Sequence, residues 1–84
     1  MGMIFKRMHG LGWGSIGPKY QFFIMHDMAL DIYSASWKHS KPVPKEKATF
    51  VGDNIHPEIG LPYFNTYEEA VAACGAALER LEKV

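Results

Sequence analysis

The sequence predicts an α+β fold, in which a small antiparallel β-sheet of three to four strands carries one C-terminal amphipathic α-helix packed on one face. Apolar side chains recur at helical spacing after residue 66, whereas residues 20–37 are rich in the aromatic and β-branched side chains that favour strands. Of the 84 residues, 48% are hydrophobic, which is enough for one small core. We therefore expect a single domain over residues 1–84.

The C-terminal helix has the clearest local signals. Residues 66–69 (TYEE) fit the S/T-x-x-E capping box, in which the Thr66 side chain accepts a hydrogen bond from the Glu69 amide. Five apolar residues at spacings of four, three, four and three then form one stripe: Tyr67, Val71, Cys74, Leu78 and Leu81. We expect this stripe to face the sheet.

Small residues form a second feature of the same helix. Gly75 stands in the middle of it, which costs about 1 kcal/mol relative to alanine. Together with Ala72 and Ala76 it offers a flat face on which another backbone can lie closely. That backbone belongs either to the chain's own sheet or to a second copy, so these three residues are the predicted contact of a homodimer.

Upstream, residues 20–26 and 29–37 predict a β-hairpin with a short break at Asp27 and Met28. A two-residue or a four-residue loop between them gives the same faces. One face then carries Phe23, Met25, Leu30 and Ile32, and we expect the helix to pack there. The other face carries Tyr20, Phe22, Ile24, Tyr33 and Trp37.

That second, aromatic face needs a cover of its own, because one helix cannot shield both sides of a sheet. The chain's own loops or a partner would supply the cover. We also expect Trp13 and Ile16 to be held outward by the glycines around them, as a contact tip. The predicted anchors for a partner are therefore the aromatic residues Trp13, Tyr20, Tyr33 and Trp37.

Two further strands are expected at residues 3–8 and 48–53. Between the hairpin and the later strand, residues 38–47 (KHSKPVPKEK) are polar and basic, and Pro42 and Pro44 stiffen them into an exposed, extended loop. Residues 52–62 are punctuated by glycine and proline and predict a second long loop. Loops of this length in a small domain are often functional.

Residues 12–17 (GWGSIG) match G-x-G-x-x-G, the phosphate-binding pattern of dinucleotide-binding folds. In those folds the glycines lie between a strand and the helix whose N-terminus meets the pyrophosphate. Here Pro18 follows Gly17, and the next residues predict a strand. We interpret the pattern as a glycine-rich bend or hairpin, and expect no nucleotide cofactor.

Composition limits the remaining chemistry. Four scattered histidines (His9, His26, His39 and His56) and the single cysteine, Cys74, show no metal-ligand spacing, and no nucleophile motif is present. We expect no metal, no cofactor and no enzymatic activity. We expect a cytoplasmic protein for three reasons. The chain has a single cysteine, no apolar run long enough to cross a membrane and no secretory signal.

Charge is divided along the chain although the net charge is zero. Residues 1–50 hold seven Lys or Arg against three Asp or Glu, and residues 51–84 hold two against six. Either the two halves attract one another in the fold, or the chain presents a basic surface to an acidic partner. The basic loop supplies the predicted binding lysines, next to Trp37: Lys38, Lys41, Lys45 and Lys47.

Residues 63–81 (YFNTYEEAVAACGAALERL) resemble the capped helix that follows a small antiparallel sheet in two families. One is the arm-type DNA-binding module at the N-terminus of phage integrases, and the other is the HicB-like antitoxin domain. The first resemblance implies DNA binding and the second implies a toxin partner. The chain lacks the dense Arg and Lys of the integrase sheet and the short strand-to-helix spacing of HicB.

These observations together predict a small non-catalytic binding or regulatory protein that acts by steric contact with a protein partner. Its most concrete form is an inhibitor of a nucleic-acid-handling complex, of the anti-CRISPR-like kind that phages and mobile elements carry; this rests on analogy of size and composition. One alternative is a nucleic-acid-binding module that uses the basic loop 38–47. The other is an antitoxin-like partner of a toxin.

Overall fold

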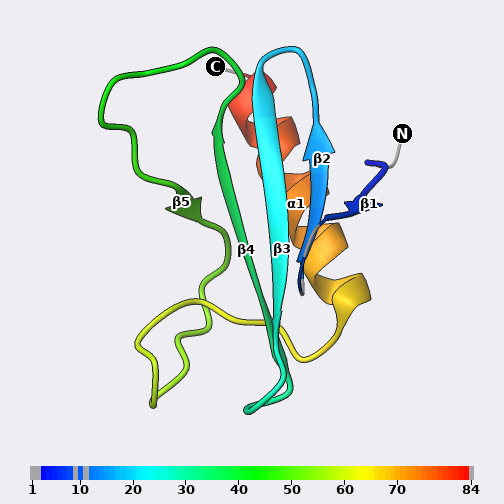
Figure 1. Cartoon of the computed structure of the whole chain (residues 1–84), viewed down its shortest axis with the longest axis vertical. Coiled ribbons are helices and arrows are strands. Elements are labelled where there is room, and N and C mark those ends of the chain that lie inside the picture. Colours follow the sequence, from blue (N-terminus) through cyan, green and yellow to red (C-terminus); the bar gives the residue numbers. More distant parts are fainter. Residues whose placement is uncertain (1–2, 9, 11, 84) are drawn as a thin grey trace.

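Within residues 3–8, 10 and 12–83, which the computed structural model describes, five strands form one antiparallel sheet and a single helix covers one face of it (Figure 1). The elements are β1 (Lys6–Arg7), β2 (Gly12–Ile16), β3 (Tyr20–Asp27), β4 (Ile32–His39), β5 (Thr49–Phe50) and α1 (Tyr67–Glu82). Each strand pairs with the next one along the chain, in the order β1-β2-β3-β4-β5. The predicted α+β class is confirmed, with one strand more than expected.

The long hairpin of β3 and β4 forms the centre of the sheet. Its register runs from Tyr20 opposite His39 to Asp27 opposite Ile32, so four residues make the turn. The Asp27 carboxylate accepts a hydrogen bond from the Leu30 amide at 3.1 Å and closes this turn. The second strand therefore begins at Ile32, three residues later than predicted.

Helix α1 forms as its sequence predicts. The Thr66 side chain accepts a hydrogen bond from the Glu69 amide at 3.1 Å, which confirms the cap. Cys74 is fully buried, and the other four members of the predicted stripe pack against the core. Local sequence signals are sufficient for this element because capping and amphipathicity act within a few turns.

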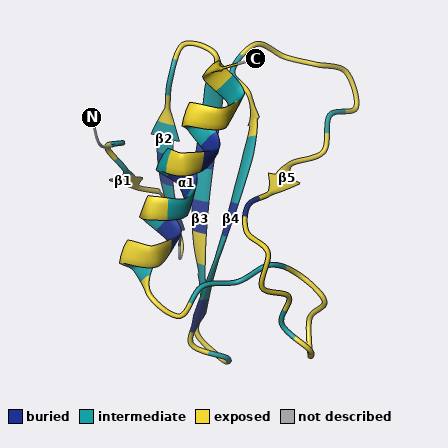
Figure 2. Cartoon of the chain, turned by 180° about the vertical axis from the view of Figure 1, so that it is seen from behind, coloured by how far each residue is buried: buried dark blue, intermediate teal, exposed yellow. Residues whose placement is uncertain are grey.

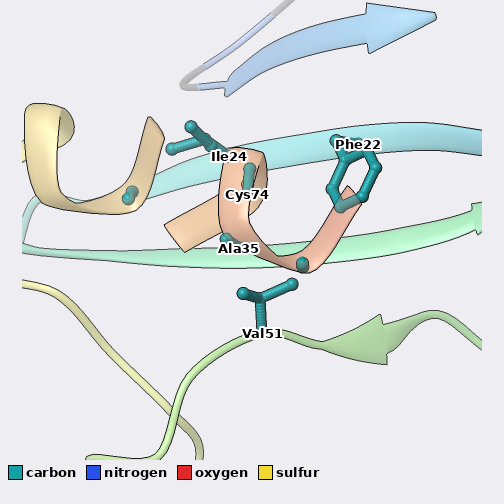
Figure 3. Close-up of a cluster of buried hydrophobic side chains, with 7 residues drawn as sticks. Phe22, Ile24, Ala35, Val51 and Cys74 are labelled. Atoms are coloured by element: carbon teal, nitrogen blue, oxygen red, sulfur yellow. The ribbon is translucent and has the colours of Figure 1, made fainter. Parts of the chain in front are cut away.

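The core lies between α1 and the inner side of the sheet (Figures 2 and 3). From the helix, Ala70, Cys74 and Ala77 are buried, and these small side chains let the helix lie close to the strands. The sheet and the chain after β5 contribute Phe22, Ile24, Ala35 and Val51. All seven belong to one cluster.

The predicted choice of face for the helix is wrong. We expected α1 on the side of Phe23 and Met25, but it packs on Phe22 and Ile24, the side that carries the aromatic residues. The reason lies in β4, where Tyr33, Ala35 and Trp37 alternate with Ser34, Ser36 and Lys38. Counting Leu30 as part of the strand concealed this alternation, because Leu30 belongs to the turn.

The glycine-rich stretch is also different from the prediction. Residues Gly12–Ile16 form the strand β2 between β1 and β3, and only the following residues turn, with the Gly17 amide donating to the Tyr20 carbonyl at 3.0 Å. The G-x-G-x-x-G pattern thus lies in a strand and a hairpin turn between antiparallel neighbours. It does not join a strand to a helix.

Alanine substitutions at Gly52 and Gly75 should change the free energy of unfolding in opposite directions. Gly52 has φ +116°, and a Cβ there would stand 2.9 Å from the Phe64 ring, whereas a Cβ at Gly75 would meet nothing within 4 Å. We expect Gly75→Ala to raise the free energy of unfolding by about 0.5–1 kcal/mol, because alanine favours the helix. Gly52→Ala should lower it by about 1–3 kcal/mol, because L residues are strained at that φ.

Urea unfolding followed by circular dichroism measures both changes. A stabilised Gly52→Ala, or a Gly75→Ala destabilised by more than 1 kcal/mol, would contradict the backbone conformation at Gly52 or the open surroundings of Gly75.

Candidate protein-binding surface

We call the side of the sheet opposite α1 the open face; it faces the viewer in Figure 1. Alternate residues of each strand point to it, because successive side chains in a strand point to opposite sides. Its apolar members come from β2, β3 and β5 and from the segment around β1: Ile4, Met8, Ile16, Phe23, Met25 and Phe50.

These apolar side chains are exposed. The exposed fraction is 77% for Ile4, 67% for Ile16 and 52% for Met25. In an antiparallel sheet with one solvated face, polar residues normally occupy that face. Single exposed apolar residues are common on protein surfaces, but a contiguous group of them marks a binding surface.

Two glycines of β2 form a trough in the open face. Gly12 and Gly14 have no side chains there, and flexible sulfur-bearing side chains lean into the space. An ideal Cβ at Gly12 would stand 2.7 Å from the Met25 sulfur, and one at Gly14 would stand 2.6 Å from the Met8 sulfur. Next to Gly14, a hollow of about 430 Å³ is lined by Ile4, Lys6, Met8, Gly14 and Ile16.

Strand β4 supplies a polar border to this apolar strip. Ser34, Ser36 and Lys38 lie on the open face opposite Met25, Phe23 and Gln21, respectively. Lys6 lies on the open face from the other side, in β1. The strip over β1 to β3 is therefore flanked by a lysine on each side.

At the turn end of the hairpin, the second long loop approaches the open face. Its two arms are held together by the hydrogen bonds from the His56 amide to Leu61 and from the Tyr63 amide to Asn54, at 2.9 and 3.0 Å. Ile59 and Leu61 line a hollow of about 450 Å³ with Met25 and Ile32. Ile32 is buried as a result, whereas Met25 stays exposed.

The predicted aromatic anchors lie on the other side of the sheet, next to α1. Trp13 packs on Tyr67 with ring centroids 4.8 Å apart and on Tyr33 at 6.1 Å, and Tyr20 packs edge-on against Trp37 at 5.5 Å. All four predicted anchors are half-buried and contact the core cluster. The expectation that the helix leaves them uncovered is wrong, because α1 occupies their side.

The predicted binding lysines are exposed, and one contact fixes their loop. Glu46 accepts hydrogen bonds from the His39 ring at 2.7 Å and from the His39 amide at 3.2 Å, which ties the loop to the end of β4. The bond from His39 lowers the pKa of the Glu46 carboxyl. Lys38 lies on the open face and Lys41, Lys45 and Lys47 lie in the loop. Trp37 points away from Lys38, toward the α1 side.

The two oppositely charged halves of the chain are not joined by ion pairs in the part that the structure describes. The ion pairs found there are His26 with Asp31 and His39 with Glu46, and both lie within residues 1–50. Attraction between the halves therefore has no direct contact to support it. The prediction of a basic surface for an acidic partner remains.

The predicted dimer contact lies on the outer side of α1. Ala72 and Ala76 are exposed and Gly75 is half-buried, whereas the close approach to the sheet uses Ala70, Cys74 and Ala77. The small residues at 72, 75 and 76 are thus not needed for packing on the chain's own sheet. A contact with a second copy stays a prediction.

The described residues do not assemble a metal site. Among them, no group of three or more His, Cys, Asp or Glu side chains could hold an ion, and His9 lies outside the described residues. Cys74 is a buried thiol, and its burial raises its pKa from 9.0 to about 12. Nor does any helix in the described chain combine the length and the apolar character that crossing a membrane requires.

The sequence predicts no binding role for the open-face residues Ile4, Met8 and Met25, whereas Ile16 belongs to the predicted contact tip and is exposed on this face. Two signals identify this face: the alternation of Ser34, Ser36 and Lys38 with apolar residues, which gives the solvent side of β4, and the glycines at every second position of β2. Searches for similar proteins add nothing further, since no family model, curated protein or solved structure matched the chain. The two family resemblances stay predictions.

Burial of Cys74 predicts a loss of stability in alkali. Above pH 9 the thiol of the unfolded chain loses its proton, while the folded thiol keeps it until about pH 12. The free energy of unfolding should therefore fall as pH rises from 9 toward 12, by up to about 1.4 kcal/mol per pH unit from this group. Urea unfolding of Cys74→Ala isolates the effect, because other alkaline groups titrate equally in both proteins. Equal slopes for the two proteins would contradict it.

The contact of Glu46 with His39 predicts local ordering of the basic loop. Glu46→Ala removes the acceptor of the His39 amide, so we expect that amide to exchange its hydrogen several-fold faster. Hydrogen exchange followed by NMR measures the rate, and Glu58→Ala in the second loop is the control. The ordering is complete above the usual pKa of 4.5 and is lost as pH falls through the lowered pKa. An unchanged His39 rate would show that the contact does not hold the loop.

Proposed function

We propose that this chain is a non-catalytic binding protein that attaches to a protein partner through its open face. The observation that carries the proposal is the group of exposed apolar side chains on that face: Ile4, Met8 and Ile16 line one hollow, and Met25 lies on the same face opposite Gly12. These side chains lie on a rigid antiparallel sheet, and its other side is anchored by α1. A partner that covers them removes apolar surface from water, which is the main driving force of protein association.

Lysines at the border suit this role. Lys6 and Lys38 lie on the open face, and Lys41, Lys45 and Lys47 are exposed in the loop that follows β4. Rim charges increase the rate and the specificity of association more than the final affinity. We propose a steric regulator, and as its concrete form an inhibitor of a nucleic-acid-handling complex, an assignment that rests on analogy of size and composition alone.

Direct nucleic-acid binding is the second candidate, and the exposed loop lysines favour it. Such binding depends on contacts with phosphate and weakens steeply as salt rises. Binding driven by the apolar open face depends far less on salt.

A pair of open-face substitutions tests the proposal. Ile16→Glu with Met25→Glu adds charge to two exposed positions, so the chain should still fold. Ala72→Glu with Ala76→Glu is the matched control on the outer side of α1. We expect at least a tenfold loss of co-purifying partner from the cells of origin for the open-face pair and no loss for the control pair. Circular dichroism checks that both fold.

The remaining outcomes also decide the question. Loss only in the control pair would place the contact on the outer side of α1. A wild-type chain that captures no protein above background would contradict the proposal. If the captured partner is lost after nuclease treatment, or when salt is raised from 50 to 500 mM, the result would favour the nucleic-acid alternative.

A further inference from the structure

The shape of the open face restricts what can lie on it. The apolar strip covers β1 to β3 and is bounded by the polar residues Ser34, Ser36 and Lys38 of β4, which separate it from the single open-face apolar residue of β5, Phe50. With strands about 4.8 Å apart, three strands span roughly 10 Å, which is about the width of one helix. A second sheet packed on this face would also have to cover the polar row of β4 and the loop at Ile59. A single helix therefore fits the apolar strip better than a sheet does.

The trough over β2 runs along this strip and provides a seat for one row of side chains. Gly12 and Gly14 form its floor. The atoms that fill it now are the flexible ends of Met8 and Met25, which can move aside at low cost. One row of apolar side chains on a helix, at positions i, i+4 and i+7, fits such a trough.

Charge identifies the chemistry of that helix. Lys6 and Lys38 flank the strip, and the open-face carboxylate of Asp27 lies away from them at the turn end of β3. A helix with Asp or Glu on both sides of its apolar row would meet these lysines. A second copy that docked its own open face would bring the same lysines against them, so face-to-face pairing is disfavoured.

We infer that the occupant of the open face is an amphipathic helix of a partner protein, with acidic flanks, seated in the trough over Gly12 and Gly14. This inference rests on the proposed function and names the class of partner. The complex has three layers, with the partner helix and α1 on opposite sides of one sheet.

Two designed peptides of 18 residues test the inference. Both carry leucine along one helical row; one has glutamate on the flanks and the other has lysine at the same positions. Methionine methyl NMR is the readout, because Met8 and Met25 lie at the trough and Met3 packs against the core on the α1 side. We expect the acidic peptide to shift the Met8 and Met25 signals and leave Met3 unchanged. At 50 mM salt it should bind about tenfold more tightly than the basic peptide, and the difference should shrink at 500 mM.

Two variants separate shape from charge. Gly14→Val fills the trough against the movable end of Met8 and suits a strand, so the fold should be kept and binding of the acidic peptide should fall about tenfold. Lys6→Glu with Lys38→Glu should reverse the preference toward the basic peptide. Gly75→Ala, on the helix, is the control that should bind like wild type.

Each other result overturns the inference in a recognisable way. Equal binding of both peptides would contradict the inference that the partner helix has acidic flanks. Shifts confined to Met3 would contradict the location of the site on the open face. If sedimentation shows that the wild-type chain forms dimers and that the double substitution Ile16→Glu with Met25→Glu abolishes them, the open face binds a second copy of the chain. If neither peptide binds while that same variant loses its cellular partner, the helix is wrong and the proposed function stands. If the variant keeps its partner, the proposed function falls as well.

Discussion

The close packing of α1 on β3 and β4 is the contact on which the rest of the structure depends. Ala70, Cys74 and Ala77 offer so little bulk that the helix reaches Phe22 and Ile24 directly. A chain of this size supports one such core. Once the helix occupies this side, the loop at Ile59 is the only cover that the described part of the chain provides for the other side of the sheet, and apolar residues there stay in contact with water.

The two sides of the sheet therefore carry different kinds of apolar side chain. The α1 side gathers the aromatic rings, including Trp13 and Tyr67, into contacts that fix the helix. The open side carries flexible methionine and isoleucine side chains, bordered by lysines, around a strand in which Gly12 and Gly14 have no side chains. Rigid rings suit a permanent core, whereas flexible methionine side chains would suit the partner contact that we propose for the open face.

The sequence predicts what is local and misses what depends on long-range contacts. The cap at Thr66 and the apolar stripe of α1 are confirmed because both act within a few residues. The side on which the helix packs was assigned wrongly, because the row of Ser34, Ser36 and Lys38 marks the side of Phe23 and Met25 as the solvent side of the sheet. Strand β2 was missed because glycine disfavours strands, and the side chains that lie over it come from Met8, which follows β1, and from Met25 in β3. The binding residues that we propose therefore differ from the aromatic residues predicted from the sequence.

The outer strands have a further consequence for a molecule that displays apolar surface. Both β1 and β5 pair over two residues only, so each border of the sheet offers few free amides and carbonyls in line. Long unpaired borders are where sheets from separate molecules join and polymerise. Because these edge strands are short, edge-to-edge pairing into fibrils is unfavourable. The protein can therefore expose an apolar sheet face without long edge strands that would pair with other molecules.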